Sequence, residues 1–199
     1  METAEKRKFI DSVVKALRKA AIEMEELQLQ TALGKSEAKD SYETAKKRFN
    51  LFLHESKAKI KTGKEKVNDL HTKMDELRVQ LNLGKAENIE AFRAQKKKLK
   101  LALHELKVKI KTNEKFKRIY AYLLIEIETF NILLEIMEDE FEPGSKWAKE
   151  SFEQGKEKFN TFIEDLKAKY GKKEPTKWEH FSGELSEAFT HFKHAFSKP

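Results

Sequence analysis

The stretch from 119 to 137, IYAYLLIEIETFNILLEIM, is the most apolar part of the 199-residue chain. Fourteen of its nineteen residues are apolar, and the interruptions include Glu126, Glu128 and Glu135. A membrane-spanning helix needs about 20 apolar residues with almost no charge, so three glutamates disfavour a span. The pattern instead predicts a helix that is apolar on nearly all sides and lies at the centre of a bundle.

The composition around this stretch is typical of long helices. Only three prolines and seven glycines interrupt a chain that is 38% charged and 39% hydrophobic, which is the profile of a coiled coil. Fourteen phenylalanines at helical spacing disfavour disorder. The absence of cysteine excludes disulfides and thiolate chemistry. The basic N-terminus is not followed by an apolar signal region, so we expect a cytoplasmic protein.

The chain contains an internal repeat with an offset of 50 residues. Residues 26–62 read ELQLQTALGKSEAKDSYETAKKRFNLFLHESKAKIKT, and residues 76–112 read ELRVQLNLGKAENIEAFRAQKKKLKLALHELKVKIKT. A weaker third copy covers residues 145–170. Repeats of this length usually mean that one supersecondary unit has been duplicated and stacked.

Two places in each copy could end a helix. Gly34 and Gly84 each precede a small residue and an acid, which favours a turn. Gly63 and Asn113 could also form left-handed helix caps. However, apolar residues recur every seven positions straight through these two sites, from Tyr42 to Leu77 and from Phe92 to Leu134. We therefore expect turns at Gly34 and Gly84 and long helices that continue through residues 63 and 113.

A further turn is indicated by Glu142-Pro143-Gly144, because proline cannot donate a hydrogen bond within a helix. The sequence thus predicts an all-α fold, an elongated antiparallel coiled-coil helical bundle over residues 1–141. Residues 142–199 form a shorter amphipathic helical tail in this prediction. Its Trp-led and Phe-rich segments could dock on the bundle or lie on a membrane surface.

Four segments resemble a family of small bacterial coiled-coil proteins described as stress-response proteins. They read SEAKDSYETAKKRF (36–49), AENIEAFRAQKKKL (86–99), KWAKESFEQGKEKF (146–159) and KWEHFSGELSEAFTHF (177–192). The chain departs from that family's pattern in its duplicated coiled segment and in the apolar helix at 119–137. The resemblance implies a soluble, helical, non-catalytic protein that is associated with stress, and it brings no biochemical activity with it.

The net charge of +7 is unevenly distributed along the chain. Residues 93–118 carry a net charge of +9 and residues 46–66 a net charge of +6, so the remainder is acidic. Such basic segments could bind nucleic acid or anionic membrane headgroups. The residues that would do so in segment 93–118 are Arg93, Lys96, Lys97, Lys98, Lys100, Lys107, Lys109 and Lys111. Alternatively, these side chains are solvated or pair with acidic residues of neighbouring helices.

The sequence shows no catalytic motif, so we do not expect an enzyme, a cofactor or a small-molecule substrate. His54 and His104 recur at the same repeat position, but neither has the second histidine that a zinc-binding helix requires. His180, His191 and His194 lie in the tail and also lack a further ligand, so we expect no metal site. The expected function is that of a structural or interaction protein with a protein partner or with self-association. The alternative is a protein that binds nucleic acid or an anionic membrane through its lysines.

Overall fold

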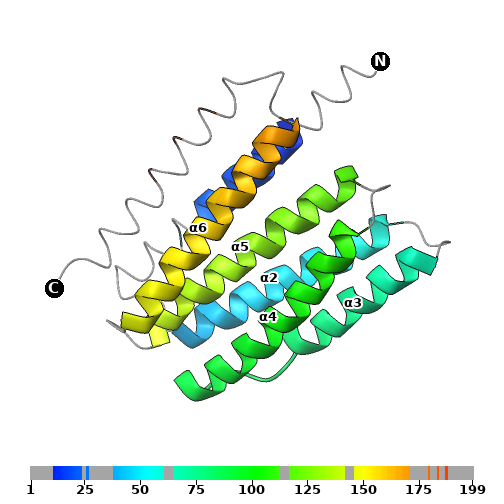
Figure 1. Ribbon diagram of the computed structural model, residues 1–199. Coiled ribbons are helices and arrows are strands. Elements are labelled where there is room, and N and C mark those ends of the chain that lie inside the picture. Colours follow the sequence, from blue (N-terminus) through cyan, green and yellow to red (C-terminus); the bar gives the residue numbers. More distant parts are fainter. Residues whose placement is uncertain are drawn as a thin grey trace, which may run out of the picture. The chain divides into compact units, whose positions relative to one another are not determined.

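The computed structural model describes residues 11–23, 26, 38–60, 65–112, 117–141, 146–170, 179, 183 and 187. The regular secondary structure of these residues is helical throughout (Figure 1). Residues 11–23 form one helix. The others are α2 (Ala38–Lys59), α3 (Glu65–Leu81), α4 (Ile89–Lys111), α5 (Lys117–Phe141) and α6 (Lys146–Tyr170). The predicted all-α class and helical bundle are therefore confirmed.

The chain divides into two compact units. Unit 2 is the continuous segment 37–143, whereas unit 1 combines residues 1–36 with residues 144–199. The end of unit 2 falls close to the predicted boundary between residues 141 and 142. The predicted domain 1–141 also included the first 36 residues, which belong to unit 1 in this division.

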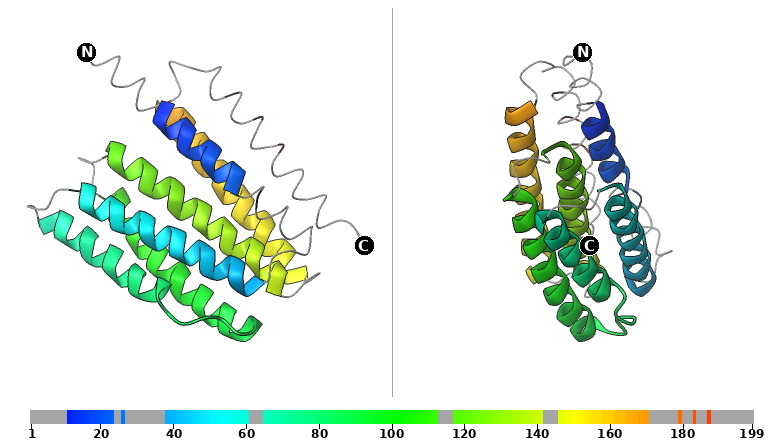
Figure 2. Two further views of the ribbon diagram at one scale, coloured as in Figure 1. Left: turned by 180° about the vertical axis from the view of Figure 1, so that it is seen from behind. Right: turned by 90° about the vertical axis from the view of Figure 1, so that its right-hand side faces the viewer.

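The described residues of unit 2 form four helices, each of which contacts two neighbours. Both α2 and α4 contact α3 and α5, so α2 and α4 lie at opposite corners of the bundle (Figure 2). Between neighbouring helices, the contacts advance along one helix as they go back along the next. Lys57 meets Asp75 and Asn50 meets Asn82. Likewise, Lys73 meets Glu105 and Asp69 meets Lys109.

The prediction that helices continue through residues 63 and 113 is wrong. Helix α2 ends at Lys59 and α3 begins at Glu65, and Asn50 Nδ2 donates to Asn82 Oδ1 at 2.9 Å. One continuous helix would separate these two residues by about 48 Å, at 1.5 Å for each residue. The chain reverses again between the end of α4 at Lys111 and the start of α5. The helices therefore end before the two residues, Gly63 and Asn113, that were the alternative candidates for helix caps.

The predicted turn at Gly84 is confirmed. Helix α3 ends at Leu81 and α4 begins at Ile89, so the chain turns around Gly84. Asn88 caps α4, because its side-chain oxygen accepts a hydrogen bond from the Ala91 N–H at 2.8 Å. Helix α5 ends at Phe141, immediately before the Glu-Pro-Gly triplet. The predicted turns at Gly34 and at Glu142-Pro143-Gly144 lie outside the described residues.

The seven-residue pattern correctly identified the core of unit 2. Its apolar members with described burial are all buried, namely Tyr42, Phe49, Leu53, Ile60, Val67, Leu70, Met74, Leu77, Leu81, Phe92, Leu99, Leu106, Ile127 and Leu134. Ser56, which the pattern also includes, is half-buried. Aromatic rings connect opposite and neighbouring helices across this core. The Phe49 and Phe130 rings stack with centroids 4.4 Å apart, and the Tyr42 ring meets the Phe92 ring edge-on at 5.0 Å.

The apolar stretch of residues 119–137 belongs to α5. Between residues 121 and 138 most of its side chains are buried, including the bulky Leu123, Ile125, Phe130 and Leu134. No described helix has the length and apolar character that a membrane crossing requires.

Unit 1 contains the helix of residues 11–23 and α6. The buried residues of the first helix include Val13, Leu17 and Ala20. Part of the predicted amphipathic tail forms α6, on which Phe159, Phe162, Ile163 and Leu166 are buried. The remainder of the predicted tail falls almost entirely outside the described residues.

Candidate functional site

Unit 2 buries several charged side chains between α4 and α5. Lys96 of α4 is 6% exposed, and Glu128, Glu135 and Glu138 of α5 are 5%, 3% and 2% exposed. Lysine and glutamate are almost never buried to this degree unless they are paired. This cluster is therefore the first candidate for a functional site.

Lys96 lies between two carboxylates of α5. Its Nζ donates to Glu135 Oε2 at 2.5 Å and also to Glu138 Oε2. Each carboxylate has a second cationic partner on α4, since Arg93 Nε donates to Glu138 Oε1 at 2.7 Å and Lys100 Nζ donates to Glu135 Oε1. Three cations and two anions are thus joined in one network, which we call the Lys96 cluster.

The pairing continues along the same two helices. Lys107 of α4 donates to Glu128 of α5, two helical turns away from the pair formed by Lys100 and Glu135. The basic residues are seven positions apart on α4 and the acidic residues are seven positions apart on α5. Seven residues forward on α4 correspond to seven residues back on α5, so each base meets an acid. The pairs therefore match only one register of α4 against α5.

The ionisation of the cluster indicates what it can do. Burial by itself would raise the pKa of Glu138, but hydrogen bonds from Lys96 and Arg93 outweigh burial and lower the pKa below its ordinary value. Glu138 thus stays ionised at neutral pH and is not poised to donate a proton. A buried ion pair adds little net stability but strongly penalises the loss of one partner. These properties suit a device that fixes helix register, and they do not suit general acid catalysis.

A second lysine is buried at the equivalent position of the first repeat copy. Lys46 of α2 is 1% exposed, and its Nζ donates to the Leu83 carbonyl oxygen at 2.8 Å. The same ammonium pairs with Glu43 at 2.7 Å and lies 4.7 Å from the centre of the Tyr42 ring. Lys46 therefore connects α2 to the turn between α3 and α4.

The eight residues predicted to bind polyanions fall into two groups. Five of them pair with carboxylates of unit 2, namely Arg93, Lys96, Lys100, Lys107 and Lys109, the last with Asp69 at 2.6 Å. The other three, Lys97, Lys98 and Lys111, are exposed and pair with no carboxylate of the described residues. Of the three consecutive lysines, Lys96 is buried and only Lys97 and Lys98 are available to a polyanion.

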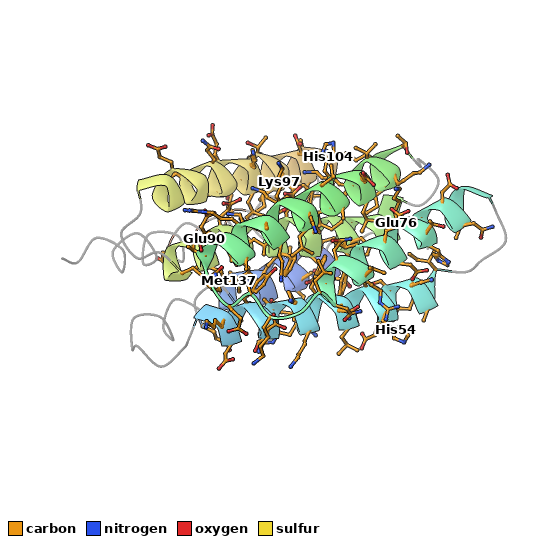
Figure 3. The ribbon with its side chains drawn as sticks, turned by 90° about the horizontal axis from the view of Figure 1, so that it is seen from below. His54, Glu76, Glu90, Lys97, His104 and Met137 are labelled. Carbon is orange, nitrogen blue, oxygen red and sulfur yellow. The ribbon has the colours of Figure 1, made fainter. Side chains whose placement is uncertain are left out.

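The candidate histidines lie apart from one another. Figure 3 shows His104 and Lys97 along α4 and His54 on α2 at the opposite edge of unit 2. Both histidines are exposed. Across the described ranges, no three His, Asp or Glu side chains are close enough together to hold a metal ion. His180, His191 and His194 lie outside those ranges.

The glutamates of α5 were not predicted as site residues. Their sequence spacing contained a usable signal, because Glu128 and Glu135 are seven residues apart, like Lys100 and Lys107. That signal has meaning only if the chain reverses between the two helices. Comparisons with protein-family models, with curated proteins and with solved structures find no match to this chain. The site is therefore interpreted from its own geometry.

Proposed function

We propose that this chain is a non-enzymatic structural and interaction protein of the cytoplasm. In this proposal unit 2 is an elongated antiparallel coiled-coil bundle that presents its outer faces to a protein partner or to a second copy. The observation that carries the proposal is the Lys96 cluster. Both of its buried carboxylates and the buried ammonium of Lys96 are paired inside the bundle. In this proposal they serve to align helices and are not held ready for a reaction.

The coiled-coil part of the proposal is supported by the repeat of seven. Core residues recur at that interval on α2, α3, α4 and α5, and the flanking charges on α4 and α5 recur at the same interval. Coiled coils use such flanking charges to choose partner and orientation. The association with stress rests on the sequence resemblance alone.

A second candidate function is binding to an anionic surface. It is favoured by Lys97, Lys98 and Lys111, which are exposed on α4 without a carboxylate partner among the described residues. It is weakened by the internal pairing of the five other basic residues. A phosphate surface would have to compete with carboxylates that already lie within hydrogen-bond distance of those five.

Binding measurements separate the two functions. Duplex DNA and anionic vesicles are titrated with the whole chain at low and moderate salt, and the titration is repeated with the K97E/K98E/K111E variant. Lys158→Glu, an exposed change on α6, is the control. If the structural proposal is correct, the original chain and both variants should bind equally weakly. Affinity that falls steeply between about 50 and 200 mM salt and is abolished only in the triple variant would overturn it.

A further inference from the structure

The outer faces of α2 and α4 carry the same three exposed residues at repeat-equivalent positions. Lys47, Leu51 and His54 on α2 correspond to Lys97, Leu101 and His104 on α4. We call these two sets the α2 stripe and the α4 stripe. Leu51 is 59% exposed and Leu101 is 62% exposed. In each set the lysine lies four residues before the leucine and the histidine three after it, so the three side chains share one helix face.

Packing in the core does not explain why the two repeat copies carry the same three exposed residues. Several positions that face or border the core differ between the copies, such as Phe49 and Leu99, and Ser56 and Leu106. An exposed leucine is not held by core packing, and a single one needs no explanation. Other core positions are identical, such as Leu53 and Leu103. Two exposed leucines retained at one repeat position, where some core positions differ, point to a shared use of the surface.

The chemistry of the stripes is an apolar centre with a basic border. On α4, Lys97 and Lys98 flank Leu101, and Val108 extends the apolar part with 46% exposure. The one nearby carboxylate of that helix, Glu105, is held by Lys73 at 2.8 Å. On α2, Lys47 and Arg48 are exposed, but the exposed Glu55 offsets part of their charge. The α4 stripe is therefore the more basic of the two.

We propose that the α2 and α4 stripes are two equivalent docking sites for an acidic amphipathic helix of a partner protein. Leucines of that helix would cover Leu51 or Leu101, and its flanking carboxylates would meet the lysines. This inference rests on the proposed interaction function and specifies the class of partner.

The placement of the stripes favours such a helix over other ligands. Because α2 and α4 occupy opposite corners of unit 2, one flat membrane or one straight duplex cannot contact both stripes. Pairing between stripes of two copies would bring lysine and histidine of one copy against those of the other, and like charges directly opposite are unfavourable. A separate acidic helix on each stripe satisfies both the geometry and the charge.

The test uses the whole chain and a fluorescently labelled designed helix with leucine at its a and d positions and glutamate at e and g. The glutamates keep this probe from pairing with itself. We expect two probe molecules for each chain, with the tighter site on α4. Leu101→Glu should weaken the tighter site at least tenfold, and Leu51→Glu should do the same to the other. Far-UV circular dichroism and thermal unfolding verify that each variant is folded.

Val79→Glu is the matched control, because Val79 is 61% exposed on α3 but lies outside both stripes. It should leave both affinities unchanged. The inference is overturned by a stoichiometry of one or zero, by equal effects of Val79→Glu and Leu101→Glu, or by binding that survives both leucine changes. If DNA or vesicle binding is instead abolished in K97E/K98E/K111E, the proposed function itself has failed, and the two failures are thereby distinguished.

Discussion

Lys46 and Lys96 occupy the same position in the two repeat copies, and both are buried, yet their ammonium groups are neutralised in different ways. Lys96 meets two carboxylates of the neighbouring helix α5. Lys46 donates to a backbone carbonyl in the turn after α3 and pairs with Glu43 of its own helix. The helical position of the lysine determines its burial, and the adjacent element determines its partner. A lysine at this repeat position therefore aligns α4 with α5 in the second copy and anchors the turn after α3 in the first.

The largest expected effect comes from removing both carboxylates around Lys96. In the E135A/E138A variant, the buried ammonium of Lys96 keeps no acidic partner within the cluster. Breaking a buried ion pair in this way typically lowers the free energy of unfolding by about 3–5 kcal/mol. Urea unfolding followed by circular dichroism measures the loss. A loss below about 1 kcal/mol, the range of an exposed pair, would show that Lys96 is solvated.

A variant with an apolar cluster sharpens this result. Replacing Lys96, Glu135 and Glu138 together by methionine or leucine removes the buried charges, while the half-exposed Arg93 and Lys100 can turn to water. Such replacements are often neutral or stabilising. We expect this triple variant to be far more stable than E135A/E138A. Equal instability of the two would mean that the ion pairs contribute net stability and not only register.

At the other corner, Lys46→Met should have a smaller effect. The substitution keeps most of the buried side-chain volume but removes the hydrogen bond to the Leu83 carbonyl oxygen and the charge next to Glu43. An unsatisfied buried acceptor costs about 1–3 kcal/mol. Hydrogen exchange should show that the amides at the start of α4 are affected more than those of α5. Uniform loss of protection over the whole bundle would contradict a local role in the turn.

Acid should weaken the Lys96 cluster through Glu138. Its pKa in the folded protein is below its ordinary value of 4.5, so its contribution to stability is complete above that pH. The contribution is lost as the pH falls through the lower pKa of the folded state. Thermal unfolding should therefore show a smaller loss of stability on acidification for Glu138→Gln than for the original chain. Parallel pH profiles of the two proteins would exclude a stabilising role for the ionised Glu138.

The smallest effect is expected one residue away from Lys96. Lys97→Ala changes an exposed side chain without a carboxylate partner among the described residues, so stability should change by less than about 0.5 kcal/mol. The contrast between neighbouring lysines tests whether only one of them faces the core. A large effect at Lys97 would mean that the orientation of α4 is incorrect.

The core of unit 2 could be predicted from sequence, whereas the path of the chain could not. The spacing of seven from Ile60 to Val67 fits a continuous helix, but it also fits a hairpin whose loop happens to preserve the phase. Hydrophobic periodicity reports which residues face the core and not whether the helix continues. Gly63 and Asn113 indicated the reversals, but the unbroken pattern outweighed them.

Because the predicted helix continued through residue 113, the Lys96 cluster could not be predicted either. If one helix ran through residue 113, Lys100 and Glu135 would lie about 52 Å apart, and α5 would have offered no partner to the lysines of α4. The burial of Lys96 could not be predicted from helix position alone, because a lysine is buried only where a tertiary partner neutralises it. The glutamates of α5 were accordingly interpreted only as a reason to reject a membrane span.

The reversal between α4 and α5 is the central claim, and a distance between two spin labels tests it most directly. Labels at Leu101 on α4 and Asn131 on α5 would lie level with each other in the bundle, because the nearby pairs Lys100–Glu135 and Lys107–Glu128 fix the register. Neighbouring helix axes are about 8–10 Å apart, so we expect a label distance below about 25 Å in pulsed electron resonance. A distance near 45 Å, as one continuous helix would give, would contradict the account.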